Sequence, residues 1–95
     1  MKKLLVWSEH ARFRMHLRQI PRALVEKVIA HPIVQAEDTL TGNSVMVGEA
    51  RYRGKDRLLA VIYEEAEQGI RVVTVHPIRA SQYRMRLQRG RWREK

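Results

Sequence analysis

The sequence predicts one α+β domain, in which two N-terminal helices pack on one face of a four-stranded antiparallel meander. Its 95 residues, of which 44% are hydrophobic, are enough for one compact core but not for two. Apolar residues recur at helical spacing as far as Pro32, and beyond it the period becomes that of strands. We therefore expect residues 1–95 to form a single domain, with a basic C-terminal tail from about residue 88.

The first helix is predicted over residues 9–17. Ser8 is a favourable N-cap, and Glu9 places a carboxylate in the first turn, where the helix dipole stabilises negative charge. The apolar positions at helical spacing are Ala11, Phe13, Met15 and Leu17. These signals indicate a helix that packs its apolar side on the rest of the domain.

The second helix is predicted over residues 21–30. Pro21 suits the first position of a helix, and His31 followed by Pro32 ends it. The apolar stripe of this helix consists of Leu24, Val25, Val28 and Ile29. We expect both helices to lie across one face of the sheet.

Four strands joined by short turns are expected after Pro32. They cover residues 33–38, 44–53, 57–64 and 70–77. The segments 58–62 and 72–75 are apolar on both faces, so the strands that contain them should be central in the sheet.

The two ends of the chain give weaker signals. Residues 80–87 are a candidate third helix, whereas residues 91–95 lack a core-forming pattern and are expected to fray. The apolar run at residues 4–7 imitates the start of a signal peptide, but it is too short for one or for a membrane span. We therefore interpret the whole chain as mature protein.

Positive charge is concentrated at both ends of the chain. Lys and Arg number 19 against 10 Asp and Glu, which gives a net charge of +9. Residues 1–31 carry net +5 and residues 79–95 carry net +6, while residues 32–78 carry net −2. Two basic segments folded onto one side would form a continuous surface for a phosphate backbone, which favours RNA as the partner. The alternative is ordinary solvated charge.

The absence of cysteine bounds the chemistry further. A chain with no Cys has no disulfide framework, no thiolate metal site and no cysteine nucleophile. This composition fits a reducing compartment, so a cytoplasmic location is expected. We predict neither a cofactor nor a metal site, because no metal-ligand spacing is convincing.

The candidate site residues come from the first helix and the last two strands. His10 and Arg14 are four residues apart and share a helix face, which Arg18 would continue. Thr74 and His76 are two apart in the last strand and face the same way, opposite Val73 and Val75, the better core candidates. Tyr63 ends the neighbouring strand. The predicted catalytic residues are His10, Arg14, Tyr63, Thr74 and His76.

These residue types suit RNA cleavage without a metal. That reaction needs a base for the ribose 2′-hydroxyl, an acid for the leaving 5′-oxygen and cations for the crowded phosphate. Histidine can serve as either acid or base near neutral pH, and arginine can hold two phosphate oxygens at once. The basic residues expected to contact RNA are Arg12, Arg18, Lys55, Arg79, Arg84 and Arg86. The structural alternative is that His76 ends an exposed strand and the arginines are a solvated helix face.

Residues 8–15 and 18–32 resemble a family of short bacterial domains of unknown function. Its pattern opens Ser-x-His-Ala-x-x-Arg-Met, which this chain matches from Ser8 to Met15. These domains look like distant relatives of the RelE and ParE toxins and of colicin-type ribonucleases. That resemblance implies a RelE-like fold and a metal-independent endoribonuclease, with His10 and Arg14 at the matching motif positions and Thr74 as a further strand position; His76 is added from strand geometry.

Two functions of different class follow. The first is a toxin-type ribonuclease that acts on RNA such as ribosome-associated mRNA and is covered by a small acidic antitoxin protein. The second is a non-catalytic RNA-binding or protein-interaction module that uses the same charge. No membrane partner is expected.

Overall fold

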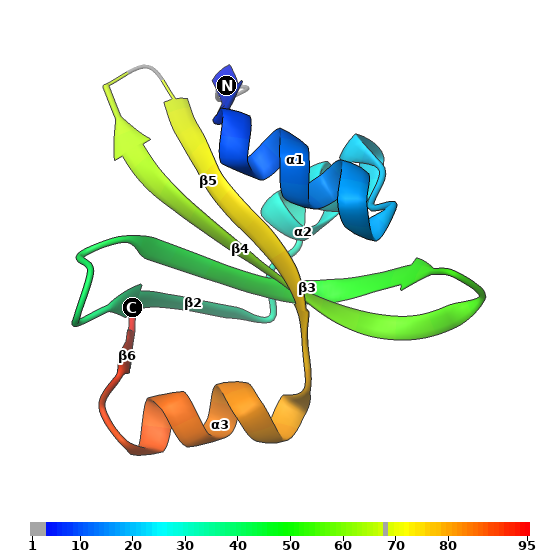
Figure 1. Cartoon of the computed structure of the whole chain (residues 1–95). Helices are drawn as coiled ribbons and strands as arrows, with labels where there is room; N and C mark the ends of the chain where they lie inside the picture. Colours follow the sequence, from blue (N-terminus) through cyan, green and yellow to red (C-terminus); the bar gives the residue numbers. More distant parts are fainter. Residues whose placement is uncertain (1–3, 68) are drawn as a thin grey trace.

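The protein folds as a six-stranded mixed sheet flanked by three helices, in a computed structural model that describes residues 4–67 and 69–95 (Figure 1). The elements in chain order are β1 (Leu4–Trp7), α1 (Glu9–Arg18), α2 (Arg22–Ala30), β2 (Val34–Asp38), β3 (Ser44–Tyr52), β4 (Lys55–Ala66), β5 (Gly69–Ile78), α3 (Ala80–Gln88) and β6 (Trp92–Glu94). The strands lie in the order β1-β5-β4-β3-β2-β6. Strands β2 to β5 are antiparallel to their neighbours in sequence.

The predicted fold class is wrong at both edges of the sheet. β1 pairs parallel with β5, and β6 pairs antiparallel with β2, so the sheet is not a four-stranded antiparallel meander. The four residues of β1 were too few to show a strand period. In β6, the side chain of Trp92 is only 3% exposed, although arginines surround it in sequence. The expectation that residues 91–95 fray is therefore also wrong.

The three helices were placed correctly, but their apolar sides were assigned less well. In α1, Ser8 caps the helix by accepting a hydrogen bond from the Ala11 amide at 2.9 Å. Ala11 and Met15 are buried as expected, whereas Phe13 and Leu17 are 58% and 59% exposed. These two residues are therefore not part of the core.

The hairpin between β3 and β4 explains why β4 is longer than predicted. Arg53 and Gly54 both have positive φ, at 54° and 74°, and they form a two-residue turn. Strand pairing consequently resumes at Lys55, which lies opposite Tyr52. The β3–β4 hairpin therefore extends beyond the end of β5, whose pairing stops at Ile78 opposite Leu58 (Figure 1).

The sheet has two differently covered faces. On the first, which we call the helix face, α1 and α2 pack over the larger core; its largest buried side chains include Val25, Val28, Leu59, Val61 and Tyr63. On the second, the α3 face, Tyr83, Leu87 and Trp92 pack on a smaller cluster. Figure 1 shows α1 and α2 on one side of the sheet and α3 on the other. α1 and α2 share one face, but α3 covers the other, so the predicted architecture of two helices on one face of a four-stranded meander is wrong.

Across residues 4–67 and 69–95, each helix is too short or too polar to cross a membrane.

Candidate functional site

An irregularity in β5 sets which of its side chains face α3. The register shifts between Ile62 and Tyr63, so that Tyr63 pairs with Val72 while Ile62 pairs with Thr74. Val73 is the extra residue and is only half-buried, whereas Val72 and Val75 join the core on the helix face. The bulge corrects the expectation that Val73 is a core residue.

Thr74 and His76 lie together on the α3 face, as predicted. Their partners across the strand pair are Ile62 and Ala60, and Ala60 and Ile62 belong to the smaller core beside α3. Both polar side chains are half-buried in a layer that is otherwise apolar. This is where a reactive side chain can be shielded from bulk water yet remain reachable.

The imidazole of His76 is held in one tautomer. Its Nδ1 lies 3.0 Å from the carbonyl oxygen of Pro77. A carbonyl only accepts, so Nδ1 carries the hydrogen and Nε2 keeps its lone pair when the ring is neutral. Burial lowers the pKa of His76 most, and the charges of Arg86 and Arg18 lower it further, against the raising effect of the Pro77 hydrogen bond. At neutral pH, His76 is therefore a neutral base.

The two cations near His76 come from opposite ends of the chain. Arg18, at the end of α1, reaches across the open edge of β5, where its Nη1 donates to the Val75 carbonyl at 2.8 Å. Arg86, on α3, stacks on the Trp92 ring with 5.0 Å between the guanidinium carbon and the ring centroid. Strand β6 thus helps to fix Arg86. Both arginines were predicted as RNA contacts, but nothing in the sequence placed them beside His76.

Tyr63 does not join this group, which corrects the prediction. Its side chain is 1% exposed and lies in the core of the helix face, on the opposite side of the sheet from His76. The ammonium of Lys95 lies 5.9 Å from its ring centroid and 2.8 Å from the Ser44 hydroxyl. Burial raises the pKa of Tyr63 most, with the charge of Glu65 adding to it. A buried phenol with a raised pKa suits a structural role.

The Ser-x-His-Ala-x-x-Arg-Met segment is partly structural. The Ser8 hydroxyl caps α1 and also donates to the Val73 carbonyl at 2.9 Å, which ties the helix to the β5 bulge. Ala11 and Met15 supply the buried side of α1. The remaining positions, His10 and Arg14, are exposed and half-buried respectively. They share a side of α1 with Arg18, whose hydrogen bond to the Val75 carbonyl connects this row with β5.

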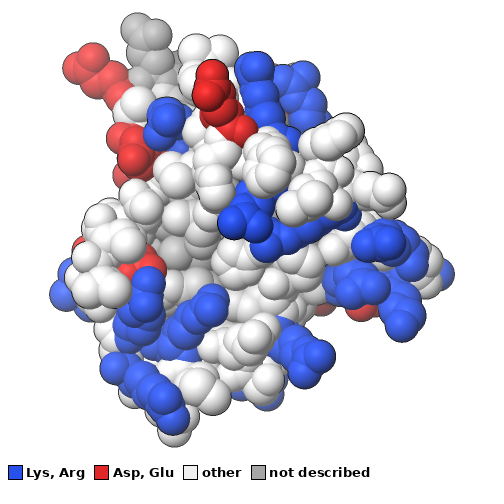
Figure 2. Space-filling model, in the orientation of Figure 1, with Lys and Arg blue, Asp and Glu red and all other residues white. Residues whose placement is uncertain are grey.

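The other predicted RNA contacts are scattered over the surface. Arg12 is exposed on α1, Lys55 begins β4 at the hairpin turn, Arg79 is the N-cap of α3, and Arg84 stacks on Tyr83 within α3. Figure 2 shows Lys and Arg side chains around a hollow near the middle of this view, along α3 below it and beside α1 above it. Asp and Glu side chains gather instead towards the tip of the β4–β5 hairpin.

Basic and acidic side chains lie in different parts of the surface. In the view of Figure 2, basic side chains flank the region between α3 and α1, and the acidic hairpin tip lies away from it. His76 is on β5, where the charges of Arg18 on α1 and Arg86 on α3 both act on it. A polyanion would therefore be drawn to the α3 face rather than to the hairpin tip.

Comparison with known proteins gives a family but no function. A model of a domain of unknown function, DUF4258, matches residues 7–77, and nothing in the match connects it with the RelE and ParE toxins or with colicin-type ribonucleases. No curated protein and no solved structure matches the chain. The matched range includes α1, the sheet from β2 to β5 and His76, but neither α3 nor β6. Because this range is most of the chain, the protein belongs to the DUF4258 family.

Proposed function

We propose that the protein is a metal-independent endoribonuclease of toxin type, with its reactive centre at His76. The observation that supports this proposal most is the environment of His76: a half-buried imidazole with Nε2 free as an acceptor, next to two arginines. A base of lowered pKa beside fixed cations is the combination that phosphodiester cleavage requires. The resemblance to the RelE and ParE toxins and to colicin-type ribonucleases is part of the same proposal.

In the proposed reaction, Nε2 of His76 removes the proton from a ribose 2′-hydroxyl. The 2′-oxygen forms a bond to phosphorus, and the bond from phosphorus to the 5′-oxygen breaks, leaving a 2′,3′-cyclic phosphate and a 5′-hydroxyl. Arg18 and Arg86 stabilise the negative charge on the phosphate, and His10 supplies the proton to the 5′-oxygen. Thr74, beside His76 on β5, can accept or donate a hydrogen bond to the ribose. Arg14 continues the cationic row of α1.

The first experiment compares cleavage by the wild type with that by His76→Ala, in buffer that contains EDTA. A single-stranded RNA oligonucleotide is the substrate, and mass spectrometry detects the 2′,3′-cyclic phosphate. Removal of a general base should lower the rate on the order of 10³-fold. His16→Ala is the matched control, because His16 is an exposed histidine of α1, and it should cleave like the wild type.

A modified substrate and a test for a metal requirement distinguish this mechanism from its alternatives. An oligonucleotide with 2′-O-methyl groups throughout should bind but resist cleavage. Cleavage that needs a divalent metal would contradict the mechanism. If no form of the protein cleaves RNA and binding weakens steeply with salt, the non-catalytic RNA-binding alternative holds instead.

We also propose a small acidic antitoxin as a protein partner, since the basic rim of the α3 face would attract acidic side chains. Such a partner would cover His76 and the RNA surface together. A small acidic protein encoded beside this one should therefore bind with nanomolar to micromolar affinity and block cleavage. Binding that leaves cleavage unchanged would contradict this arrangement.

A further inference from the structure

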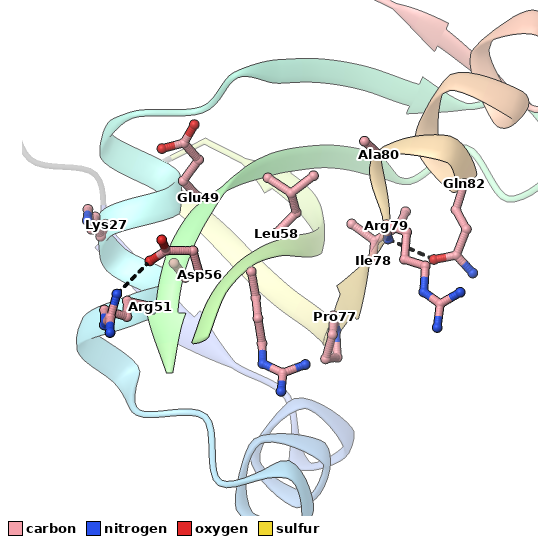
Figure 3. A pocket seen from close by; sticks show the side chains of 12 residues that line it. Lys27, Glu49, Arg51, Asp56, Leu58, Pro77, Ile78, Arg79, Ala80 and Gln82 are labelled. Carbon is pink, nitrogen blue, oxygen red and sulfur yellow. Dashed lines mark hydrogen bonds and ion pairs between the residues drawn. The ribbon is translucent and has the colours of Figure 1, made fainter. Parts of the chain in front are cut away.

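A pocket separate from the His76 site lies where the β3–β4 hairpin extends past the end of β5. Its volume is about 830 Å³, which is in the range of small-molecule sites. Its walls come from the hairpin, from α2 through Lys27, and from the connection between β5 and α3 (Figure 3). Figure 3 shows side chains from these three sources around a common space.

The pocket is lined by more cations than anions. Its four basic residues are Lys27, Arg51, Arg57 and Arg79, and its two acidic residues are Glu49 and Asp56. Arg51 and Asp56 form an ion pair of 3.2 Å and so cancel one another. In the described part of the chain, Lys27, Arg57 and Arg79 form no ion pair. The pocket therefore keeps an excess of positive charge, with these three cations against the single carboxylate of Glu49.

Arg57 is the most unusual of these groups. Its guanidinium carbon lies 5.1 Å from the centroid of the buried Tyr52 ring, which holds the side chain in place. The residue is half-buried, and its Nε is fully covered but has no hydrogen-bond partner among the described residues. A buried donor without an acceptor destabilises the fold, and more so when it is charged. An anion bound at the accessible end of this guanidinium would supply the counterion that the described residues do not.

The rest of the pocket suits a nucleotide rather than a bare anion. Leu58, Pro77 and Ala80 give it half-buried apolar walls, against which a sugar or a base can pack. The side-chain oxygen of Gln82 accepts a hydrogen bond from the Arg79 amide at 2.8 Å, which leaves its amino group to donate. An arginine fork for phosphate, an apolar wall and an amide donor are together the parts of a small phosphorylated-ligand site.

We propose that this pocket binds a nucleotide through its phosphate, with Arg57 and Arg79 as the phosphate ligands. The nucleotide can be free or can be one unit of an RNA chain that continues past the end of β5. His76 faces α3, whereas Pro77, which lines the pocket, pairs with Leu59 and faces the other side of the sheet, so an RNA chain that reaches both sites must pass around the end of β5. The RNA form of the ligand rests on the proposed function, whereas the phosphate pocket itself does not.

The test is a titration of the folded protein with uridine 5′-monophosphate, followed by NMR on the arginine Nε–Hε signals. The covered Nε–H of Arg57 should exchange slowly, give a resolved signal and shift on binding, with a Kd below about 1 mM. Uridine without the phosphate should not shift it. Arg57→Gln and Arg79→Gln should each weaken binding at least about tenfold, while Arg71→Gln, an equal charge change at an exposed residue of β5 that pairs with Glu64, should not.

Three further measurements keep the outcome decisive. Arg57→Lys retains the charge but loses the fork, so it should also bind weakly; its thermal midpoint verifies that it folds. His76→Ala should bind the mononucleotide like the wild type, even though it cannot cleave RNA. A tetranucleotide that binds at least tenfold tighter than the mononucleotide, and loses this gain in Arg79→Gln, identifies an RNA unit as the ligand; equal affinities identify a free nucleotide.

The pocket proposal fails if Arg57→Gln and Arg71→Gln bind the mononucleotide equally, or if all exposed arginine signals shift together. Either result would leave the cleavage results at His76 unaffected. Conversely, a specific shift of the Arg57 signal in a protein that never cleaves RNA would uphold the pocket and contradict the ribonuclease proposal.

Discussion

The two faces of the sheet differ in what covers them and in what they carry. The helix face lies under α1 and α2, and its central side chains, such as Leu59 and Val61, are completely buried. The α3 face has the smaller core and keeps two polar side chains, Thr74 and His76, half-buried within it. One face therefore provides most of the stability, and the other accommodates a reactive group at a cost in packing.

The largest expected effect is a difference in stability between two substitutions on the same strand, one on each face of the sheet. Leu59 and Ile62 are both on β4, but Leu59 is fully buried on the helix face and Ile62 is half-buried on the α3 face. Leu59→Ala should cost about 3 kcal/mol, which lowers the melting temperature by about 12 °C or more. Ile62→Ala should cost about 1 kcal/mol, because less apolar area is lost and neighbouring side chains can collapse.

Thermal and urea unfolding measure both variants, and secondary structure by circular dichroism verifies that both fold. Equal losses would contradict the idea that stability resides mainly on the helix face. Cleavage by Ile62→Ala is also informative, because Ile62 pairs with Thr74; it should fall, while that of Leu59→Ala below its melting temperature should not.

A smaller effect concerns the attachment of β6. Both carboxylate oxygens of Asp38 accept from Arg91 Nε, at 3.0 and 3.1 Å, and one also accepts from the amides of Leu40 and Thr41. Burial acts to raise the pKa of Asp38, but these hydrogen bonds and the charge of Arg91 outweigh it, so the pKa lies below 3.8. Asp38→Asn should destabilise the protein by about 1–2 kcal/mol at neutral pH.

The pH dependence of that difference tests its origin. Because the folded pKa is lowered, the ionised carboxylate stabilises the fold above its ordinary pKa of 3.8, and this stabilisation disappears as the pH falls through the lowered value. Unfolding of the wild type and Asp38→Asn should therefore converge in acid. Glu37→Gln is the control, because its ion pair with Arg93 is exposed and should contribute little. A difference that persists unchanged at low pH would point to packing instead.

The long helices and strands were predicted from the sequence more accurately than the short strands at the edges of the sheet. Ser8, Pro32 and the apolar stripes predicted α1, α2 and the strands β2 to β5, because these segments are long enough to show a period. β1 and β6 have four and three residues and are strands only because β5 and β2 offer free edges to pair with. Pairing of this kind depends on tertiary contacts, which no local pattern carries.

The candidate site divides in the same way. Alternation along β5 was enough to place Thr74 and His76 on one face. It could not show the bulge at Val73, which takes that residue out of the core. The wrong placement of Tyr63 has a different cause: alternation along β4 puts it on the face opposite to Ile62, and therefore opposite to Thr74. Nor could it show Arg18 and Arg86 near His76, since their sequence separation from it gives no hint of contact. The pocket at Arg57 was missed because it forms where three separate elements meet.

The smallest expected effect, and the most specific to the α3 face, is on the pH dependence of RNA cleavage. Burial lowers the pKa of His76, and the positive charge of Arg86 lowers it further. If neutral His76 is the base, kcat/KM should rise with pH up to this pKa, which sets the acidic limb of the profile. Arg86→Gln removes a charge that disfavours the imidazolium, so the pKa of His76 should rise and the acidic limb should move to higher pH.

Arg84→Gln, on the same helix but stacked on Tyr83, should lower RNA affinity without moving the limb. Both variants weaken phosphate binding, so only the position of the limb distinguishes them. If the limb is unchanged in Arg86→Gln, His76 is not the group whose protonation controls the reaction, and the chemistry would not belong to the α3 face.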